Sequence, residues 1–162
     1  MKKIILIVFA LFFFYSSYGQ KNKIPLYNPE SDAKVELTSA IELANKENKN
    51  IFIQIGGNWC SWCYLFHDFC KNSPDISTVI NENYISVKVN YSKENYNKAL
   101  LAELGYPQRF GFPVFVILDK NGDLIHIQDS SLLEDGKGYN FEKVINFLKN
   151  WSPEALSPET YN

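Results

Sequence analysis

Two cysteines three positions apart carry the clearest chemistry in this chain. Cys60 and Cys63 lie in the segment Trp-Cys-Ser-Trp-Cys at 59–63, directly after the apolar run 51–55 and a pair of glycines. A helix that begins here places Cys60 at its first turn, where free N–H groups and the helix dipole favour an anion. Such a position lowers a thiol pKa from about 8.5 to roughly 3.5–7.5. The spacing therefore predicts a reactive thiolate with a second thiol within disulfide reach.

The same cysteines could instead form a static structural disulfide or half of a metal site. A structural bridge that closes so short a loop stabilises little by the loop-entropy argument. Cys60, Cys63, His67 and Cys70 share one helical stripe, but they rise about 15 Å along it, at 1.5 Å per residue. Zinc ligands must all lie within roughly 2.3 Å of one ion, which a straight helix cannot provide. Tyr64 stands where a c-type haem motif needs histidine. We therefore expect a redox pair, with no metal and no cofactor.

The sequence allows two interpretations for each of three further residues, Cys70, His67 and Arg109. Cys70 lies about 10.5 Å up the helix from Cys63, too far for a disulfide, and is either a buried thiol or a regulatory or intermolecular one. His67, one turn after Cys63, is either a proton carrier or a packed or surface residue. Arg109 either touches the site or a substrate, or is a solvated loop charge.

The first nineteen residues have the pattern of a secretory signal peptide. Two lysines precede an unbroken apolar run of 12 residues, Ile4–Tyr15, and small residues precede a predicted cut after Gly19. An uncleaved anchor is the alternative, but the run is shorter than the roughly 20 residues that cross a bilayer. We expect export to the periplasm or outside the cell, with no stable membrane insertion after cleavage.

The composition fits one exported domain with a real core. The chain has 162 residues, of which 46% are apolar and 15% aromatic, and a net charge of −2. It holds a single arginine and scattered lysines, so no nucleic-acid partner is expected. Export implies an oxidising compartment, yet the three cysteines fall within 11 residues, as in a site rather than a stapled scaffold.

Local patterns predict helices alternating with strands. Residues 20–33 indicate an extended N-terminal arm, 34–151 the domain, and 152–162 a C-terminal tail. Asp32 is a candidate N-cap for the first helix, Ser92 for a later one, and Asn121-Gly122 indicates a hairpin turn. The predicted elements are a helix at 35–49, a strand at 51–55, helices at 60–71 and 75–83, a strand at 84–89, a helix at 92–104, strands at 114–118 and 123–128, and a helix at 141–151.

The sequence resembles the thioredoxin superfamily over residues 34–151. The resemblance rests on two motifs about 50 residues apart, the segment 59–63 and Gly111-Phe112-Pro113, which opens a strand that ends in Asp-Lys-Asn-Gly at 119–122. It implies an α/β thioredoxin fold, in which a central mixed β-sheet has helices on both faces. The element order agrees, because a strand–helix–strand unit requires a parallel crossover and a hairpin adds antiparallel strands.

The resemblance also implies a role for each matching residue. Cys60 would be the attacking cysteine, exposed and of lowered pKa, and Cys63 the buried cysteine that resolves the mixed disulfide. Pro113 would follow a cis peptide bond and face the pair, which leaves the backbone of Phe112 free to pair with a substrate chain. Trp59 would shield the sulfurs and shape the contact surface.

Two positions depart from the family pattern, and one aromatic residue stays ambiguous. Thioredoxins carry a buried acid six residues before the first cysteine, where this chain has Gln54, an amide that cannot take a thiol proton. The dipeptide between the cysteines is Ser-Trp rather than Gly-Pro, which leaves the direction of electron flow open. Trp62 is either part of an apolar docking rim or part of the core.

These patterns together predict an exported thiol–disulfide oxidoreductase that reduces or exchanges disulfides in client proteins. It would need an electron donor or acceptor protein. The alternative is a binding module without enzymatic activity, a holdase that retains clients on its apolar rim.

Overall fold

The computed structural model describes residues 24–162 of the chain. The predicted signal peptide at 1–19 and the first residues of the predicted arm lie outside the described residues. Within residues 24–162, none of the helices has both the length and the apolar character needed to span a membrane.

A four-stranded mixed sheet forms the centre of the domain. Its strands are β1 (Asn50–Gly56), β2 (Tyr84–Asn90), β3 (Val114–Leu118) and β4 (Leu124–Asp129), in the order β2-β1-β3-β4. β1 pairs parallel with β2 and antiparallel with β3, which pairs antiparallel with β4. The predicted parallel crossover and the predicted hairpin are both present.

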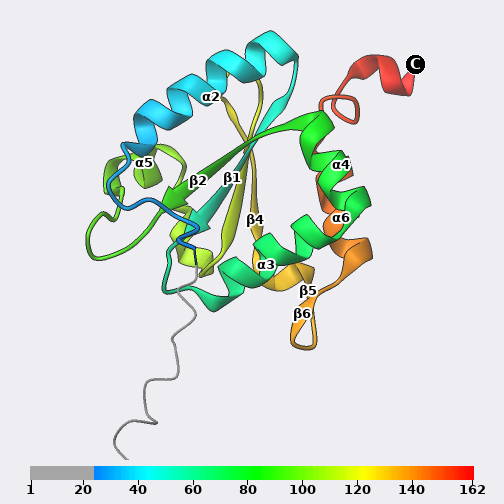
Figure 1. Ribbon diagram of the computed structural model, residues 1–162. Coiled ribbons are helices and arrows are strands. Elements are labelled where there is room, and N and C mark those ends of the chain that lie inside the picture. Colours follow the sequence, from blue (N-terminus) through cyan, green and yellow to red (C-terminus); the bar gives the residue numbers. More distant parts are fainter. Residues whose placement is uncertain (1–23) are drawn as a thin grey trace, which may run out of the picture.

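Helices cover both faces of this sheet (Figure 1). They are α2 (Ala33–Glu47), α3 (Ser61–Asn72), α4 (Pro74–Asn83), α5 (Lys98–Glu103) and α6 (Phe141–Asn150). α2 and α5 share one hydrophobic core with the sheet, whereas α3, α4 and α6 share the other. The predicted thioredoxin fold is confirmed.

Side chains along β1 alternate between these two cores, as a strand requires. Ile51, Ile53 and Ile55 pack under α2 and α5, and Phe52 packs on the opposite face against Phe66 of α3. Gln54 has the same parity as Phe52, so it points toward α3 and the cysteine pair. Every residue of β1 is buried, which explains why its sequence from Ile51 to Ile55 is apolar apart from Gln54.

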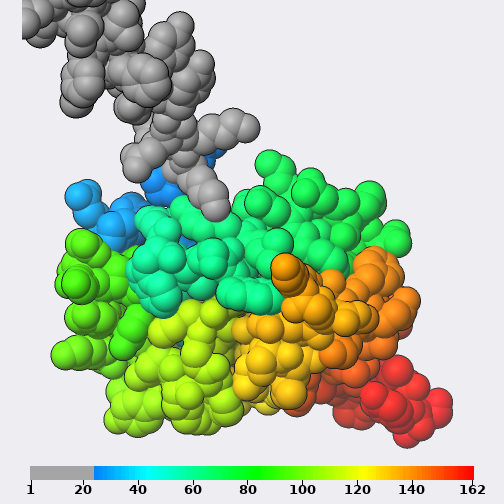
Figure 2. Space-filling model, turned by 90° about the horizontal axis from the view of Figure 1, so that it is seen from below, coloured from blue at the N-terminus to red at the C-terminus, as the bar shows by residue number. Residues whose placement is uncertain are grey.

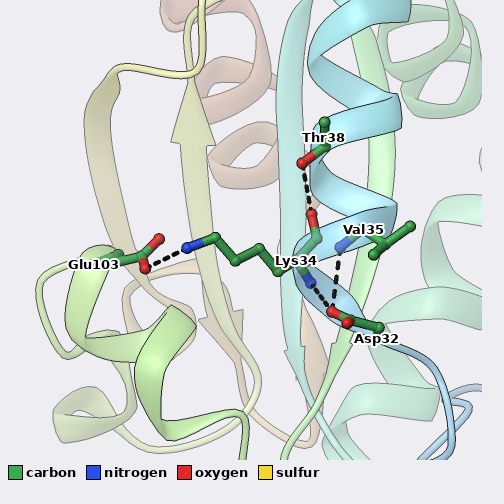
Figure 3. Close-up of polar contacts among 5 residues, drawn as sticks. All are labelled: Asp32, Lys34, Val35, Thr38 and Glu103. Atoms are coloured by element: carbon green, nitrogen blue, oxygen red, sulfur yellow. Dashed lines mark hydrogen bonds and ion pairs between the residues drawn. The ribbon is translucent and has the colours of Figure 1, made fainter.

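The first helix begins at the predicted cap. The Asp32 carboxylate accepts hydrogen bonds from the backbone N–H groups of Lys34 and Val35, at 2.9 and 3.2 Å (Figure 3). The Lys34 ammonium also pairs with the Glu103 carboxylate at 2.7 Å, which links α2 to α5. Both side chains are exposed, so we assign this ion pair only about 0–1 kcal/mol of stability.

The helix predicted at 92–104 is wrong in its first half. α5 begins only at Lys98, and its N-cap residue Asn97 has a left-handed backbone with φ 48°. The Asn90 amide donates to the Asn95 carbonyl at 2.9 Å, and the Asn97 amide donates to the Asn90 carbonyl at 2.7 Å. These side-chain bonds hold the segment 91–97 as a loop, because asparagine competes well with helical backbone bonds.

Several short elements were absent from the sequence prediction. A hairpin of β5 (Glu134–Asp135) and β6 (Gly138–Tyr139) follows β4 and brings Tyr139 onto Phe66 of α3. Strands of two residues leave no periodic signal, so only tertiary contacts reveal this hairpin. The remaining short elements are the 3-10 helices η2 (Pro107–Phe110), η3 (Ser130–Leu133) and η4 (Pro158–Tyr161).

Candidate active site

The cysteine pair lies where β1 leads into α3, and it is joined as a disulfide. The α-carbons of Cys60 and Cys63 are 5.3 Å apart. Cys60 is the N-cap residue of α3, and its sulfur accepts a hydrogen bond from the backbone N–H of Cys63 at 3.1 Å. The sulfur therefore occupies the position at which a helix N-terminus stabilises a thiolate.

Both sulfur-bearing residues are covered in this disulfide form. Cys60 is 4% exposed and Cys63 is fully buried. They form a small apolar cluster with Tyr27, against which Leu26 and Phe112 pack. The predicted exposure of Cys60 is therefore wrong for the oxidised protein, because the N-terminal arm and the proline loop close over it. Of the two cysteines, Cys60 remains the one with any solvent contact.

Gly56, at the end of β1, allows the chain to pass close to the second sulfur. A β-carbon on this residue would lie 2.3 Å from the Cys63 sulfur and 2.8 Å from the Tyr27 hydroxyl oxygen. Real β-carbons do not approach other atoms so closely, so glycine is required here. The Tyr27 hydroxyl and the Cys63 sulfur therefore both lie next to the α-carbon of Gly56, on the side where a β-carbon would be.

An aromatic rim surrounds the proline loop. The peptide bond between Phe112 and Pro113 is cis, as predicted. The Phe112 ring stacks on Tyr91 with ring centres 4.7 Å apart and meets Trp59 edge-on at 5.4 Å. Trp59 is 59% exposed and donates from Nε1 to the Tyr91 carbonyl at 2.8 Å, so its orientation is fixed although its ring is open to solvent.

Trp62 lies between the cysteine pair and the second core. It packs against the cysteine cluster and also against the core beneath α3. Its ring meets Tyr139 edge-on at 5.6 Å, and the Tyr139 hydroxyl donates to the Trp62 carbonyl at 3.4 Å. The residues near 60, those near 112 and the turn of the β5–β6 hairpin lie side by side on one face of the molecule (Figure 2).

A buried amide stands behind the second cysteine. Gln54 is 1% exposed and donates from Nε2 to the Tyr27 hydroxyl at 2.9 Å and to the Cys63 carbonyl at 3.1 Å. Its Oε1 accepts from the ammonium of Lys88 at 2.9 Å. The amide is therefore satisfied at both ends, and it connects the cysteine helix to a lysine on β2.

Lys88 opens into a pocket of about 260 Å³ between α3, α4 and the sheet. Burial lowers the pKa of the Lys88 ammonium to about 8. Burial raises the pKa of the Cys70 thiol, which lines the same pocket, to about 12. The pKa of His67 is lowered by burial first and by the Lys88 charge second. Cys70 is a free, buried thiol, which agrees with the first of its two interpretations.

Arg109 is engaged within its own loop. Its guanidinium donates to the carbonyls of Gly105 and Tyr106 and lies over the Phe110 ring, 4.3 Å from the ring centre. These contacts hold the turn that precedes the cis-proline segment. Arg109 therefore supports the turn before the proline loop, and its partners among residues 24–162 are Gly105, Tyr106 and Phe110 rather than the cysteines.

The N-terminal arm contributes residues that sequence reasoning missed. The Asn58 side chain accepts from the backbone N–H groups of Leu26 and Tyr27 at 2.9 and 3.0 Å and donates to the Tyr27 carbonyl at 2.8 Å. The Tyr64 hydroxyl donates to the same Asn58 oxygen at 3.1 Å. Tyr27 lies in a polar, proline-containing stretch, so nothing local indicates that its ring is buried against the cysteines.

Within residues 24–162, no group of three or more histidine, cysteine, aspartate or glutamate residues is arranged to hold a metal ion.

The sequence matches one family model and parts of several longer proteins. The family described as "Thioredox_DsbH: Protein of unknown function, DUF255" matches residues 32–152. Spermatogenesis-associated protein 20 of Rattus norvegicus is 38% identical over 50 residues, which cover 31% of this chain and 6% of that protein. An uncharacterized protein of Caenorhabditis elegans is 24% identical over 127 residues, covering 73% of this chain and 17% of its own. The chain thus spans less than a fifth of either relative.

Solved structures share the fold at low sequence identity. A disulphide isomerase from Xylella fastidiosa Temecula1 has a TM-score of 0.68 and 18% identity, covering 77% of this chain and 95% of its own. A DsbH oxidoreductase has a TM-score of 0.55 and 22% identity, covering 74% and 82%. The reduced DsbD C-terminal domain of Neisseria meningitidis has a TM-score of 0.51 and 22% identity, covering 73% and 96%.

Proposed function

The chain belongs to the Thioredox_DsbH family (DUF255), and from that membership and the geometry of its cysteines we propose that it is an exported thiol–disulfide oxidoreductase. The single observation that carries the proposal is the Cys60–Cys63 disulfide at the N-terminus of α3, beside the cis-proline loop. In the reduced protein, the Cys60 thiolate attacks a client disulfide, and one client sulfur leaves as a thiolate. Cys63 then attacks Cys60, which releases the second client thiol and restores the observed disulfide.

The assignment of the two roles follows from burial and backbone bonds. Cys60 keeps some solvent contact and accepts a hydrogen bond from the first turn of α3, which suits the attacking thiolate. Cys63 is fully buried behind it and cannot reach an external disulfide before Cys60 does. Burial of the attacking sulfur in the oxidised form also protects the disulfide from adventitious thiols.

Client contact is assigned to the aromatic rim. Trp59 and Phe112 form an edge-on pair next to the cysteines, and Trp59 is largely exposed. We assign the backbone of Phe112, just before Pro113, to pairing with an extended client segment. Trp62 borders the pair from the side of Tyr139. Together these four residues form a contact surface for a polypeptide rather than a pocket for a small molecule.

Export and partners complete the proposal. The signal-peptide pattern at 1–19 supports transfer to the periplasm or outside the cell. A catalytic cycle that reduces clients leaves the cysteines oxidised, so a donor protein must return two electrons. A cycle that oxidises clients needs an acceptor protein in the same position.

Reduction of insulin disulfides with dithiothreitol as the electron source tests the proposal. The full chain should accelerate precipitation of the insulin B chain, and Cys60→Ser should abolish the acceleration. Cys70→Ser is the matched control, because it removes a thiol outside the pair. Equal rates for the wild-type protein and Cys60→Ser would contradict an oxidoreductase.

The holdase alternative has one structural observation in its favour. Trp59, Tyr106 and Phe110 are exposed large apolar residues at 59%, 59% and 40%, around or next to the proline loop. A double variant of Cys60→Ser and Cys63→Ser separates the two functions. A holdase would keep suppressing the aggregation of an unfolded client, whereas an oxidoreductase would lose its activity.

A further inference from the structure

The hydrogen bonds behind Cys63 all run in one direction. An ammonium group can only donate, so the bond from Lys88 fixes which end of the Gln54 amide is the oxygen. The other end of the amide must then donate, and it does so to the hydroxyl oxygen of Tyr27 at 2.9 Å. The chain of donors therefore runs from Lys88 through Gln54 to Tyr27, with a positive charge at its start.

The proton of the Tyr27 hydroxyl is not used within this chain, because the hydroxyl accepts from Gln54. Within residues 24–162, the recorded hydrogen bond of that hydroxyl is the one it accepts from Gln54. The Tyr27 oxygen and the Cys63 sulfur lie 2.8 and 2.3 Å from the same point, the place of a β-carbon on Gly56. The sulfur therefore lies near the hydroxyl, next to Gly56. In the disulfide form the two groups are not hydrogen-bonded to each other, and the sulfur becomes available as an acceptor once the disulfide opens.

We propose that Tyr27 donates a hydrogen bond to the Cys63 thiolate in the reduced and mixed-disulfide states, as the last member of a chain that begins at Lys88. This inference rests on the proposed oxidoreductase function. Under this proposal Tyr27 is a catalytic residue, because its hydroxyl contacts the reacting sulfur in those two states, whereas Gln54 and Lys88 are positioning residues. These hydrogen-bonded residues stabilise the thiolate at a site where thioredoxins carry a buried acid and this protein has the amide Gln54.

The step that this hydrogen bond assists is the resolution of the mixed disulfide. Cys63 loses its proton to solvent, and its thiolate attacks the Cys60 sulfur. The new bond joins Cys60 to Cys63, the bond from Cys60 to the client sulfur breaks, and the client thiolate leaves with the electron pair and takes a proton. Tyr27 keeps its proton throughout and stabilises the negative charge on Cys63 before the attack. A hydrogen bond to the charged form lowers a pKa, and neighbouring bonds in a chain strengthen one another.

Lys88 stays mostly charged at neutral pH although burial disfavours its ammonium. α3 contributes His67, Cys70 and Lys71 to the pocket of Lys88, and α4 contributes Ser77 and Ile80, neither of which ionises. The Lys88 pKa of about 8 leaves the ammonium mostly protonated at pH 7. Burial raises the pKa of the Tyr27 phenol, the hydrogen bond from Gln54 lowers it, and the nearby Tyr139 and Tyr64 raise it again, so the phenol stays protonated.

The reaction of the reduced full-length protein with 5,5′-dithiobis(2-nitrobenzoate) tests the proposal. The first thionitrobenzoate released reports the attack by Cys60, and the second reports resolution by Cys63. Tyr27→Phe should leave the first phase unchanged and slow the second about tenfold at pH 7, since one pKa unit is a tenfold change in thiolate. The pH profile of the second phase should move upward by about one unit.

Two further variants make the outcome decisive. Tyr84→Phe removes the hydroxyl of another buried tyrosine, which donates to the Leu148 carbonyl at 2.6 Å, and should leave both phases unchanged. Lys88→Met cuts the chain at its start without touching the arm and should slow the second phase about threefold, so it also serves if Tyr27→Phe does not fold. An unchanged second phase in Tyr27→Phe, or in Lys88→Met, overturns the inference. A wild-type protein that releases no second thionitrobenzoate overturns the proposed function instead.

Discussion

Gly56 and Cys63 approach each other so closely that a β-carbon on Gly56 would lie 2.3 Å from the Cys63 sulfur. This contact joins the end of β1 to the first turn of α3, and it sets how deeply Cys63 lies in the protein. The Tyr27 hydroxyl oxygen also lies close to this β-carbon position, at 2.8 Å. The glycine that ends the buried strand is therefore part of the site rather than a simple break.

Gly56→Ala should destabilise the protein by about 1–3 kcal/mol, the usual cost of forcing an extra carbon into a packed site. The added carbon must displace a sulfur held by a disulfide and a ring that fills the core. Urea unfolding of the oxidised protein measures the loss. Gly138→Ala is the control, because a β-carbon there meets nothing within 4 Å. Similar losses in both variants would contradict the close contact.

Cys63→Ser should trap client proteins as mixed disulfides on Cys60. The attacking thiolate remains, but no thiol follows to resolve the bond. Non-reducing gels of the variant mixed with an oxidised client measure the adduct, which dithiothreitol should release. Cys60→Ser is the matched control and should trap little, because the remaining cysteine is buried. Stronger trapping by Cys60→Ser would reverse the two roles.

Trp59→Ala should weaken the binding of client proteins more than it slows the thiol–disulfide exchange step. Trp59 is 59% exposed and borders Phe112, so its removal costs little core packing and reduces the contact surface. We expect KM for a protein disulfide to rise several-fold, whereas the rate with a small aromatic disulfide changes less than twofold. Steady-state kinetics with both substrates measure the difference. Leu132→Ala, at an exposed apolar residue of η3, is the control. An equal loss with both substrates would place Trp59 in the chemical step.

Cys70 should resist alkylation in the native protein. Burial raises its thiol pKa to about 12, so the fraction of thiolate at pH 8 is very small. Iodoacetamide followed by mass spectrometry of reduced protein should label Cys60 first, and Cys70 only after unfolding in urea. Rapid native labelling of Cys70 would favour its second interpretation, a regulatory or intermolecular thiol.

Lys88→Met should change the pH dependence of stability above neutral pH. The folded pKa of Lys88 is about 8, below the unfolded value of 10.5, so between these values the unfolded chain binds more protons. Stability from this group therefore rises as the pH increases from about 8 to 10.5. Cys70 acts in the opposite sense above pH 9, since its folded pKa is the higher one.

The difference in unfolding free energy between wild type and Lys88→Met isolates the lysine. From pH 7.5 to 9.5 it should shift in favour of the wild type by about 1 kcal/mol, less than full burial would give because Lys88 is only partly covered. Urea titrations at each pH measure the shift. Lys120→Met, at an exposed lysine, should show no such trend. A flat difference for Lys88→Met would contradict the lowered pKa.

The sequence by itself determined the sheet, its order of elements and the cysteine pair. β3 is a continuous apolar run, and β1 is apolar from Ile51 to Ile55 except at Gln54. Each is bounded by residues that end a strand, so their positions are encoded locally. The Asp32 cap also follows from a local residue type, whereas the cis bond before Pro113 was implied by the resemblance to the thioredoxin superfamily. In these segments the local preference and the final packing agree.

Only the tertiary structure decided what surrounds the sulfurs. Tyr27 comes from a polar arm, Lys88 from a strand position that alternates as if it faced solvent, and Tyr139 from a hairpin of two-residue strands. The loop at 91–97 follows instead from local asparagine side chains, which bond to backbone carbonyls five and seven residues away and compete with helix formation. The surroundings of the sulfurs depend on contacts between residues far apart in the chain, such as Lys88 with Gln54 and Tyr139 with Trp62, and periodicity and spacing carry no information about such contacts.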